Sequence, residues 1–214
     1  MLGHNRRMSG AECLAEMLNA YEVTHIFHVP AVLRRTMAEL ERRTAIKRLH
    51  VHGEKAAAYM ADGYARASGK PGICMAQVIG ALNLAAGLRD AWLAHSPVIA
   101  MTGGREPRTK FRKVYQEIDD VPAFEPVTKL NATIDDVARF PDMLRQAFRV
   151  ATSGTPPGRC ICSSAAMRAR SMRMKRSSTR CASYSSLACR HFGRSPSKQA
   201  SSLRWDIYRM PSGR

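Results

Sequence analysis

The sequence predicts an α/β fold, in which a parallel sheet has helices on both faces and is followed by a disordered basic tail. Two short runs, residues 73–78 and 97–102, are apolar throughout, and a stretch with helical spacing of apolar residues lies between them. Strands of this kind are buried on both faces, which requires helices on both sides of a parallel sheet. Residues 159–214 show no such period and are rich in Arg and Ser, so we expect them to be disordered.

The first half of the chain alternates between helices and strands. Ser9 and Glu12 are spaced as a capping box, and the apolar residues that follow recur at helical intervals, which predicts a helix over residues 9–21. The further expected elements are a strand at 24–29, a helix at 33–43, a strand at 48–52, a helix at 54–68, a strand at 73–78, a helix at 81–93 and a strand at 97–102.

The second half begins with a polar stretch that contains three prolines, residues 105–127, which predicts a loop with one short helix. A weak strand at 129–133 and a helix at 135–151 follow. The sheet then needs one more strand, for which residues 159–162 are a poor but possible substitute. Functional sites in sheets of this type lie at the carboxyl ends of the strands.

The net charge of +17 is unevenly distributed. Residues 1–158 carry 21 Lys and Arg against 16 Asp and Glu, whereas residues 159–214 carry 13 against one. We therefore divide the chain into an N-terminal extension (1–7), a folded domain (8–158) and an aberrant Arg- and Ser-rich tail (159–214).

Two interpretations of the tail remain open. Clustered Lys and Arg release counterions from phosphate, which favours nucleic acid as a partner. Arg, Ser and Cys are also what GC-rich coding DNA yields when it is read out of frame. Codons for residues 159–162 permit Pro-Val-His-Leu in a shifted frame, a strand-like run where the sheet needs one. We favour the frame-shifted interpretation over a nucleic-acid-binding tail.

Composition excludes several other classes of protein. No apolar run approaches the ~20 residues that span a bilayer, so we expect no membrane association. The six cysteines show no disulfide-like spacing, which favours a reducing, cytoplasmic compartment. Cys160 and Cys162 lack the further ligands that a zinc site needs, and we expect no metal site in this chain.

Two groups of residues at the strand ends could carry chemistry. Glu54 begins a helix directly after Gly53; it either complements the helix dipole, which is common, or serves proton transfer as a partly buried carboxylate. Four histidines alternate along two expected strands, and they are either a metal cluster or, more commonly, structural. They are His25, His28, His50 and His52.

Residues 8–158 resemble the N-terminal pyrimidine-binding domain of thiamine diphosphate-dependent enzymes, closest to the acetolactate synthase-like group. The stretch from His52 to Gly72 carries this resemblance, with Glu54 placed six residues before the Met of Met60-Ala-Asp-Gly-Tyr-Ala-Arg66. Supporting segments are Gly80-Ala-Leu-Asn83, Pro97-Val-Ile-Ala-Met-Thr-Gly103, Tyr115-Gln116-Glu117 and Pro126-Val-Thr-Lys129. Two loops depart from the Gly-rich pattern of the family, at residues 28–31 and 77–83.

The resemblance implies that this is a thiamine pyrophosphate-binding domain that acts on a 2-keto acid by decarboxylation or carboligation. It implies that Glu54 hydrogen-bonds N1′ of the aminopyrimidine ring and that Gln116 lies on the substrate side, which makes these two the catalytic residues. The implied cofactor-binding residues are Glu54, Pro30, Gln77, Gly80 and Asn83.

The family also holds Mg²⁺ and the diphosphate group in another domain, which begins with Gly-Asp-Gly. These 214 residues contain no Gly-Asp-Gly, so the expected partner is a homodimer mate or a chain that bears the diphosphate domain. We expect a truncated, frame-shifted fragment that is inactive alone. The alternatives are the pyrimidine-domain subunit of a split decarboxylase and a non-catalytic protein with a nucleic-acid-binding tail.

Overall fold

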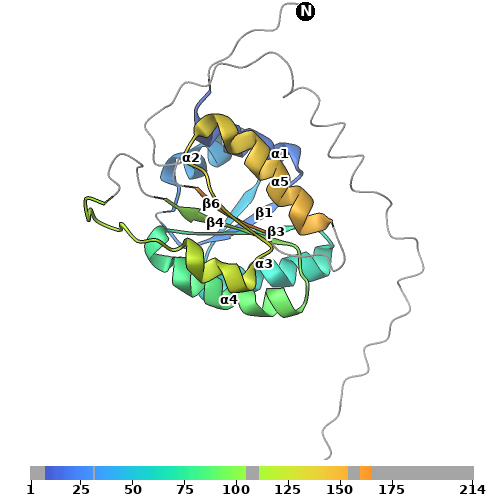
Figure 1. The fold of residues 1–214 in the computed structure, drawn as a ribbon. Helices are drawn as coiled ribbons and strands as arrows, with labels where there is room; N and C mark the ends of the chain where they lie inside the picture. Colours follow the sequence, from blue (N-terminus) through green and yellow to red (C-terminus); the bar gives the residue numbers. More distant parts are fainter. Residues whose placement is uncertain (1–7, 31, 105–110, 154–159, 165–214) are drawn as a thin grey trace, which may run out of the picture. The chain divides into compact units, whose positions relative to one another are not determined.

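The structure is a computed structural model, and it describes residues 8–30, 32–104, 111–153 and 160–164. Within these ranges one parallel sheet has the strand order β2-β1-β3-β4-β6-β5 (Figure 1). Its strands are β1 (His25–His28), β2 (Lys47–His50), β3 (Gly72–Ala76), β4 (Val98–Gly103), β5 (Leu130–Thr133) and β6 (Cys160–Ser164). The parallel sheet expected from the sequence is confirmed.

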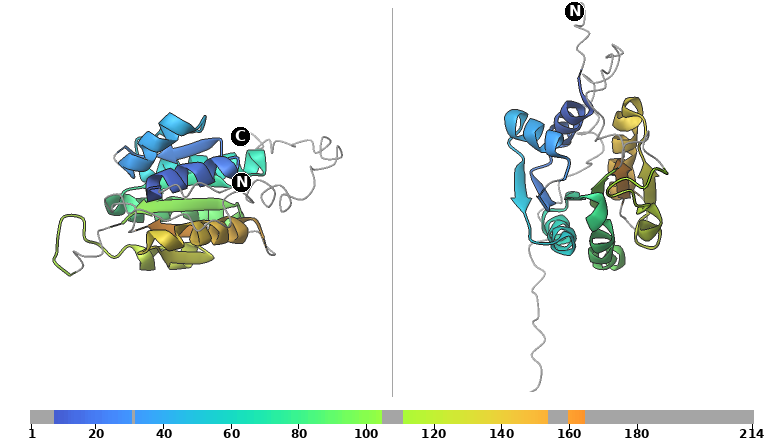
Figure 2. Two further views of the ribbon diagram at one scale, coloured as in Figure 1. Left: turned by 90° about the horizontal axis from the view of Figure 1, so that it is seen from above. Right: turned by 90° about the vertical axis from the view of Figure 1, so that its left-hand side faces the viewer.

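Helices cover both faces of this sheet (Figures 1 and 2). One face carries α1 (Gly10–Ala20), α2 (Arg34–Arg43) and α5 (Phe140–Thr152). The other carries α3 (Glu54–Ser68), α4 (Ala81–Leu93) and the short 3₁₀ helix η3 (Val121–Val127). Two further 3₁₀ turns, η1 (Val78–Gly80) and η4 (Val137–Arg139), precede α4 and α5.

Strand register divides the core into two halves. Ile26, Ile73 and Ile99 lie side by side across β1, β3 and β4, and they face α1, α2 and α5. The next residue of each strand points to the opposite face, because side chains alternate along a strand. Every one of these side chains is buried, which explains why the strands read as apolar throughout.

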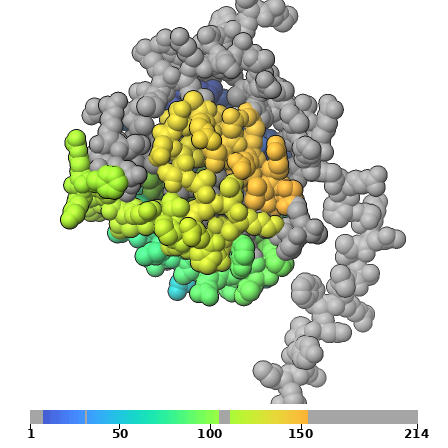
Figure 3. Space-filling view, in the orientation of Figure 1, coloured from blue at the N-terminus to red at the C-terminus, as the bar shows by residue number. Residues whose placement is uncertain are grey.

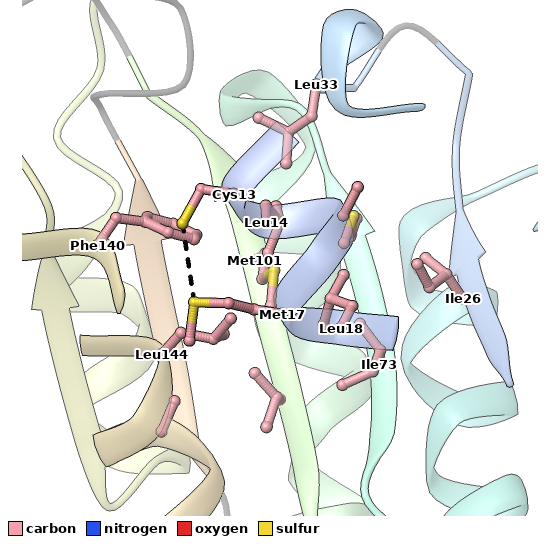
Figure 4. Close-up of a cluster of buried hydrophobic side chains, with 14 of the residues drawn as sticks. Cys13, Leu14, Met17, Leu18, Ile26, Leu33, Ile73, Met101, Phe140 and Leu144 are labelled. Carbon is pink, nitrogen blue, oxygen red and sulfur yellow. Dashed lines mark hydrogen bonds between the residues drawn. The ribbon is translucent and has the colours of Figure 1, made fainter. Parts of the chain in front are cut away.

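Large side chains fill the first half of the core. Leu14, Met17 and Leu18 of α1 lie over the sheet, and Phe140 and Leu144 of α5 lie beside Cys13 and Met17 of the same helix (Figure 4). The second half is built from alanines of α3 and α4, so these two helices approach closely. A Cβ added to Gly87 of α4 would lie 2.7 Å from the carbonyl oxygen of Lys55, so the absence of a side chain at this glycine permits the close packing.

Most of the expected elements lie within two residues of their expected bounds. The capping box of α1 is present, with the Ser9 and Glu12 side chains each bonded to the other's backbone N–H. Helices α3 and α4 begin and end where the sequence predicts. The strand expected over residues 73–78 instead ends at Ala76, because the chain turns into η1 there. The last helix begins with a separate turn, since Pro141 occupies its first turn.

The sheet extends past residue 158. Strand β6 occupies Cys160–Ser164 and pairs with both β4 and β5, so the segment that the sequence offers as a poor but possible strand does supply the last strand. Residues 1–7 and 165–214, which hold the expected extension and most of the expected tail, lie outside the described residues. No helix in the described ranges is long and apolar enough to cross a membrane.

Candidate functional site

Strand order reverses beside β1. From β1 the chain moves outward to β2 and then returns past β1 to form β3 and β4. Ligands of open parallel sheets bind at such a reversal, outside the carboxyl ends of the strands. His28 ends β1 and Gln77 directly follows β3, while Glu54 begins the helix after β2. These residues therefore lie at the same carboxyl end of the strands, where a site is expected.

Glu54 occupies a small cradle between two helix starts. It is the first residue of α3, preceded by Gly53 in an extended conformation, and its side chain is half-buried. Nδ2 of Asn83 donates a hydrogen bond of 3.3 Å to Oε2 of the carboxylate. Oε1 lies against the backbone of Gly80, where an added Cβ would stand only 2.2 Å away. The carboxylate is thus held by α4 as well as by its own helix.

Gln77 and Gln116 form a second pair at the same edge. Nε2 of Gln77 donates to Oε1 of Gln116 at 2.9 Å, and both residues are half-buried. The backbone N–H of Gly80 donates to the carbonyl oxygen of Gln77 at 2.9 Å, which joins this pair to the cradle of Glu54. Five of the six residues named from the sequence are therefore connected.

Pro30 stands apart from this group. It follows β1 at the same end of the sheet and its side chain is exposed. None of the contacts described above includes it. Pro30 therefore lies beside the site, and it takes no part in the contacts that connect the other five residues.

Sequence reasoning missed the contribution of Gly103, the last residue of β4. A Cβ at Gly103 would lie 2.3 Å from Oε1 of Gln77, so the absence of a side chain there admits the glutamine amide. The signal was present in the sequence, because Gly103 directly follows the apolar run of residues 97–102.

His28 is the second feature that the sequence did not reveal. Its ring is buried and packs edge-on against His50, with the centroids 4.4 Å apart. Nδ1 lies 3.1 Å from the carbonyl oxygen of Val29, whereas Nε2 has no hydrogen-bond partner among the described residues. Burial lowers the pKa of His28. The hydrogen bond to the Val29 carbonyl raises this pKa, and the neighbouring His50 and Arg48 lower it further.

The four histidines do not assemble into one group. His25 lies at the other end of β1, where its Nδ1 is 2.8 Å from the hydroxyl of Thr24. Within the described ranges, no set of three or more His, Cys, Asp and Glu side chains is placed to hold a metal ion. The pairing of His28 with His50 is that of packed strand neighbours.

Comparison with known proteins decides the family. Residues 8–123 match the family described as "Thiamine pyrophosphate enzyme, N-terminal TPP binding domain". The chain belongs to this family. The matched range of this thiamine pyrophosphate enzyme domain includes Glu54, Gly80, Asn83 and Gln116, the residues that the structure brings to one edge of the sheet.

Curated relatives of this thiamine pyrophosphate-binding domain include acetolactate synthases. A probable acetolactate synthase large subunit of Methanocaldococcus jannaschii is 37% identical over 150 residues, 70% of this chain and 25% of that protein. The chloroplastic acetolactate synthase of Arabidopsis thaliana is 37% identical over 149 residues, 69% and 22% respectively. The Bacillus subtilis acetolactate synthase is 31% identical over 146 residues, 68% and 26%. The chain thus spans about a quarter of the length of these relatives.

Proposed function

We propose that Glu54 is the catalytic carboxylate of a half-site for the aminopyrimidine ring of thiamine diphosphate, in an enzyme that decarboxylates or ligates 2-keto acids. One observation carries the proposal: the carboxylate of Glu54 lies in a cradle that only a glycine at position 80 permits. A first-turn glutamate that served only the helix dipole would need no such cradle. Membership of the thiamine pyrophosphate enzyme family supports the choice of ligand.

The residues present fit the cofactor. Glu54 would share a proton with a ring nitrogen, and its half-buried setting would strengthen such a bond because it is less screened by water. Asn83 orients the carboxylate through Oε2. The main chain from Gln77 to Gly80 and the exposed Pro30 would border the ring. When bound, thiamine diphosphate supplies the electron sink for breaking the bond between a keto carbon and its carboxylate.

Gln116 would face the substrate. It lies next to Gln77, at the strand end that carries the glycine cradle. A side-chain amide there can bond a keto or carboxylate oxygen of a 2-keto acid. In this proposal Glu54 handles the proton of the cofactor, while Gln116 orients the acid.

The outer face of α3 and α4 exposes apolar side chains, which supports an enzyme assembled from more than one chain. Large apolar side chains are exposed on both helices and on the turn before α4: Tyr59, Met60, Ile79, Leu82 and Leu93. An exposed apolar surface of this kind marks an interaction site. We propose that a second copy, or a separate chain that carries the diphosphate domain with its Mg²⁺, covers this face in the cytoplasm. A separate chain would make the protein one subunit of a split decarboxylase.

We also propose that residues 159–214 are read out of frame. Their composition supports this, with 13 Lys and Arg against one acid. Sequencing the DNA on both sides of codon 158 tests it. A long shifted frame with Gly-Asp-Gly downstream is expected, and the absence of such a frame would refute it. The competing nucleic-acid function would require salt-dependent binding that is lost when residues 165–214 are deleted.

Binding of thiamine to the full chain tests the role of Glu54. Thiamine carries the aminopyrimidine ring without the diphosphate, so it reports on this half-site alone. We expect weak binding that Glu54→Gln abolishes and that Glu125→Gln, an exposed glutamate of η3, leaves unchanged. When a chain with the diphosphate domain is added, Glu54→Gln should also stop exchange of the cofactor's C2 proton. Equal binding or exchange in the Glu54 variant would reject the proposal.

A further inference from the structure

Gln77 is a polar side chain in otherwise apolar surroundings. Every residue of β3, which it follows, is buried, and so is Val78, which comes next. A half-buried amide in such a place is costly unless its polar atoms are bonded. Nε2 of Gln77 makes such a bond by donating to Oε1 of Gln116 at 2.9 Å. The residue therefore joins two segments that are 39 positions apart in the sequence.

The direction of the Gln77 side chain is set by the neighbouring strand. Ala76 pairs with Thr102 in the sheet, so Gln77 stands beside Gly103 at the end of β4. A Cβ at Gly103 would lie 2.3 Å from Oε1 of Gln77. The amide thus lies across the bare backbone of Gly103, and any side chain at position 103 would push it away.

Gln116 itself belongs to a strained turn. Its φ is +61°, and Phe111 and Lys113 also have positive φ values, of +66° and +51°, which residues with a Cβ rarely adopt. The Glu117 carboxylate braces this turn by accepting from the backbone N–H groups of Phe111 at 2.5 Å and Val114 at 3.1 Å.

The rest of this turn gains little support from packing. Phe111 and Tyr115 are 85% and 83% exposed, and the segment directly after residue 110 stands out from the body of the molecule (Figure 3). Strained conformations persist only where surrounding contacts hold them. The hydrogen bond from Gln77 is such a contact, and it ties the turn to the end of the sheet.

We propose that Gln77 is a positioning residue for Gln116. Its side chain holds the Gln116 amide at the substrate side of the site. Its carbonyl oxygen accepts from the N–H of Gly80 and so holds the turn in which Gly80 lies against Glu54. One residue thereby couples the cofactor side of the site to the substrate side. This inference rests on the proposed function for the role of Gln116, but the contact itself can be tested without any ligand.

Hydrogen exchange of the full chain, followed by mass spectrometry, tests the coupling. Loss of one hydrogen bond in Gln77→Ala should make the amides of residues 111–118 exchange about twofold to tenfold faster. Gln77→Glu keeps the length of the side chain, and the Gln116 amide can turn over to donate to it, so this variant should restore most of the protection. Gln146→Ala, an exposed glutamine of α5, should change nothing in this segment.

A double-mutant cycle separates positioning from a general loss of stability. If Gln77 acts through Gln116, then Gln77→Ala should add less than a twofold change in exchange when Gln116 is already Ala. Unchanged exchange in Gln77→Ala, or the same increase in both backgrounds, would overturn the inference. Thiamine binding, which should be lost in Glu54→Gln, is measured separately on the wild-type chain. Failure of wild-type thiamine binding would therefore count against the proposed function and leave the exchange result to decide the role of Gln77.

Discussion

Gly80 and Glu54 are in direct contact, and the position of the carboxylate depends on the glycine having no side chain. A Cβ on Gly80 would lie 2.2 Å from Oε1, 2.4 Å from Cδ and 2.6 Å from Cγ of Glu54. Nonbonded atoms do not approach this closely, so one of the two residues would have to move. Gly80 therefore determines the position of the Glu54 carboxylate, although the two residues are 26 positions apart in the sequence.

Gly80→Ala should therefore displace the Glu54 carboxylate and abolish thiamine binding. The side chain of Glu54 is flexible at its end and only half-buried, so it can swing aside. The free energy of unfolding should fall by only about 1 kcal/mol, near the mean for a point mutation. Titration with thiamine and urea unfolding measure the two effects separately.

Gly63→Ala is the matched control for this variant. Gly63 lies in α3, is exposed, and an added Cβ would meet no atom within 4 Å. Alanine favours a helix interior by about 0.5–1 kcal/mol over glycine. The control should bind thiamine normally and be slightly more stable. Normal binding by Gly80→Ala as well would show that the cradle does not position Glu54.

Gly87→Ala should destabilise the fold without a direct effect on the site. A Cβ at Gly87 would lie 2.7 Å from the Lys55 carbonyl oxygen and 2.8 Å from the Ala58 Cβ. Backbone atoms cannot swing aside, so α3 and α4 would have to separate. Overpacking of this kind costs about 1–3 kcal/mol. Urea unfolding would show it as a lower midpoint, and an unchanged midpoint would contradict the close contact.

The free energy of unfolding should fall as the pH drops through the range in which free histidine gains a proton. Burial lowers the pKa of His28 in the folded state, while in the unfolded chain it is about 6.5. Below that value the unfolded chain binds a proton that the folded chain resists, so the stability present above pH 6.5 is lost on acidification. Thermal unfolding between pH 8 and pH 5 would measure this effect as the slope of the unfolding midpoint temperature against pH.

His28→Leu should reduce this pH dependence, because the buried titrating group is removed. His52→Asn is the control, since His52 is exposed at the same edge of the sheet and should leave the slope unchanged. If both variants keep the slope of the wild type, another group is responsible for it.

The full chain should self-associate through the outer face of α3 and α4. Leu82 and Leu93 are 62% and 75% exposed on α4, and exposed apolar side chains of this size seek a partner. Sedimentation velocity should show species larger than a monomer, and Leu82→Lys with Leu93→Lys should shift them toward the monomer. A wild-type chain that sediments only as a monomer would contradict this expectation.

Local structure was largely predictable from the sequence. The bounds of α3 and α4 agree with expectation because both helices carry clear signals, such as Gly69, which ends α3 in the left-handed conformation. The strands were less predictable in their bounds. β3 ends at Ala76 although Val78 is apolar, because the turn η1 that follows depends on the packing of Gly80, which no local pattern reveals.

The amino-acid sequence by itself determined the alternation of helices and strands, the family, and the identity of the acidic residue at the head of α3. The alternation follows from short-range spacing, whereas the family and the acidic residue follow from the resemblance over residues 8–158. Only the tertiary structure decided that Gly80 makes room for Glu54, that Gln77 bonds Gln116 across Gly103, and that His28 is buried beside His50. Each of these relationships joins residues that are distant along the chain, and strand order and register alone bring them within contact distance.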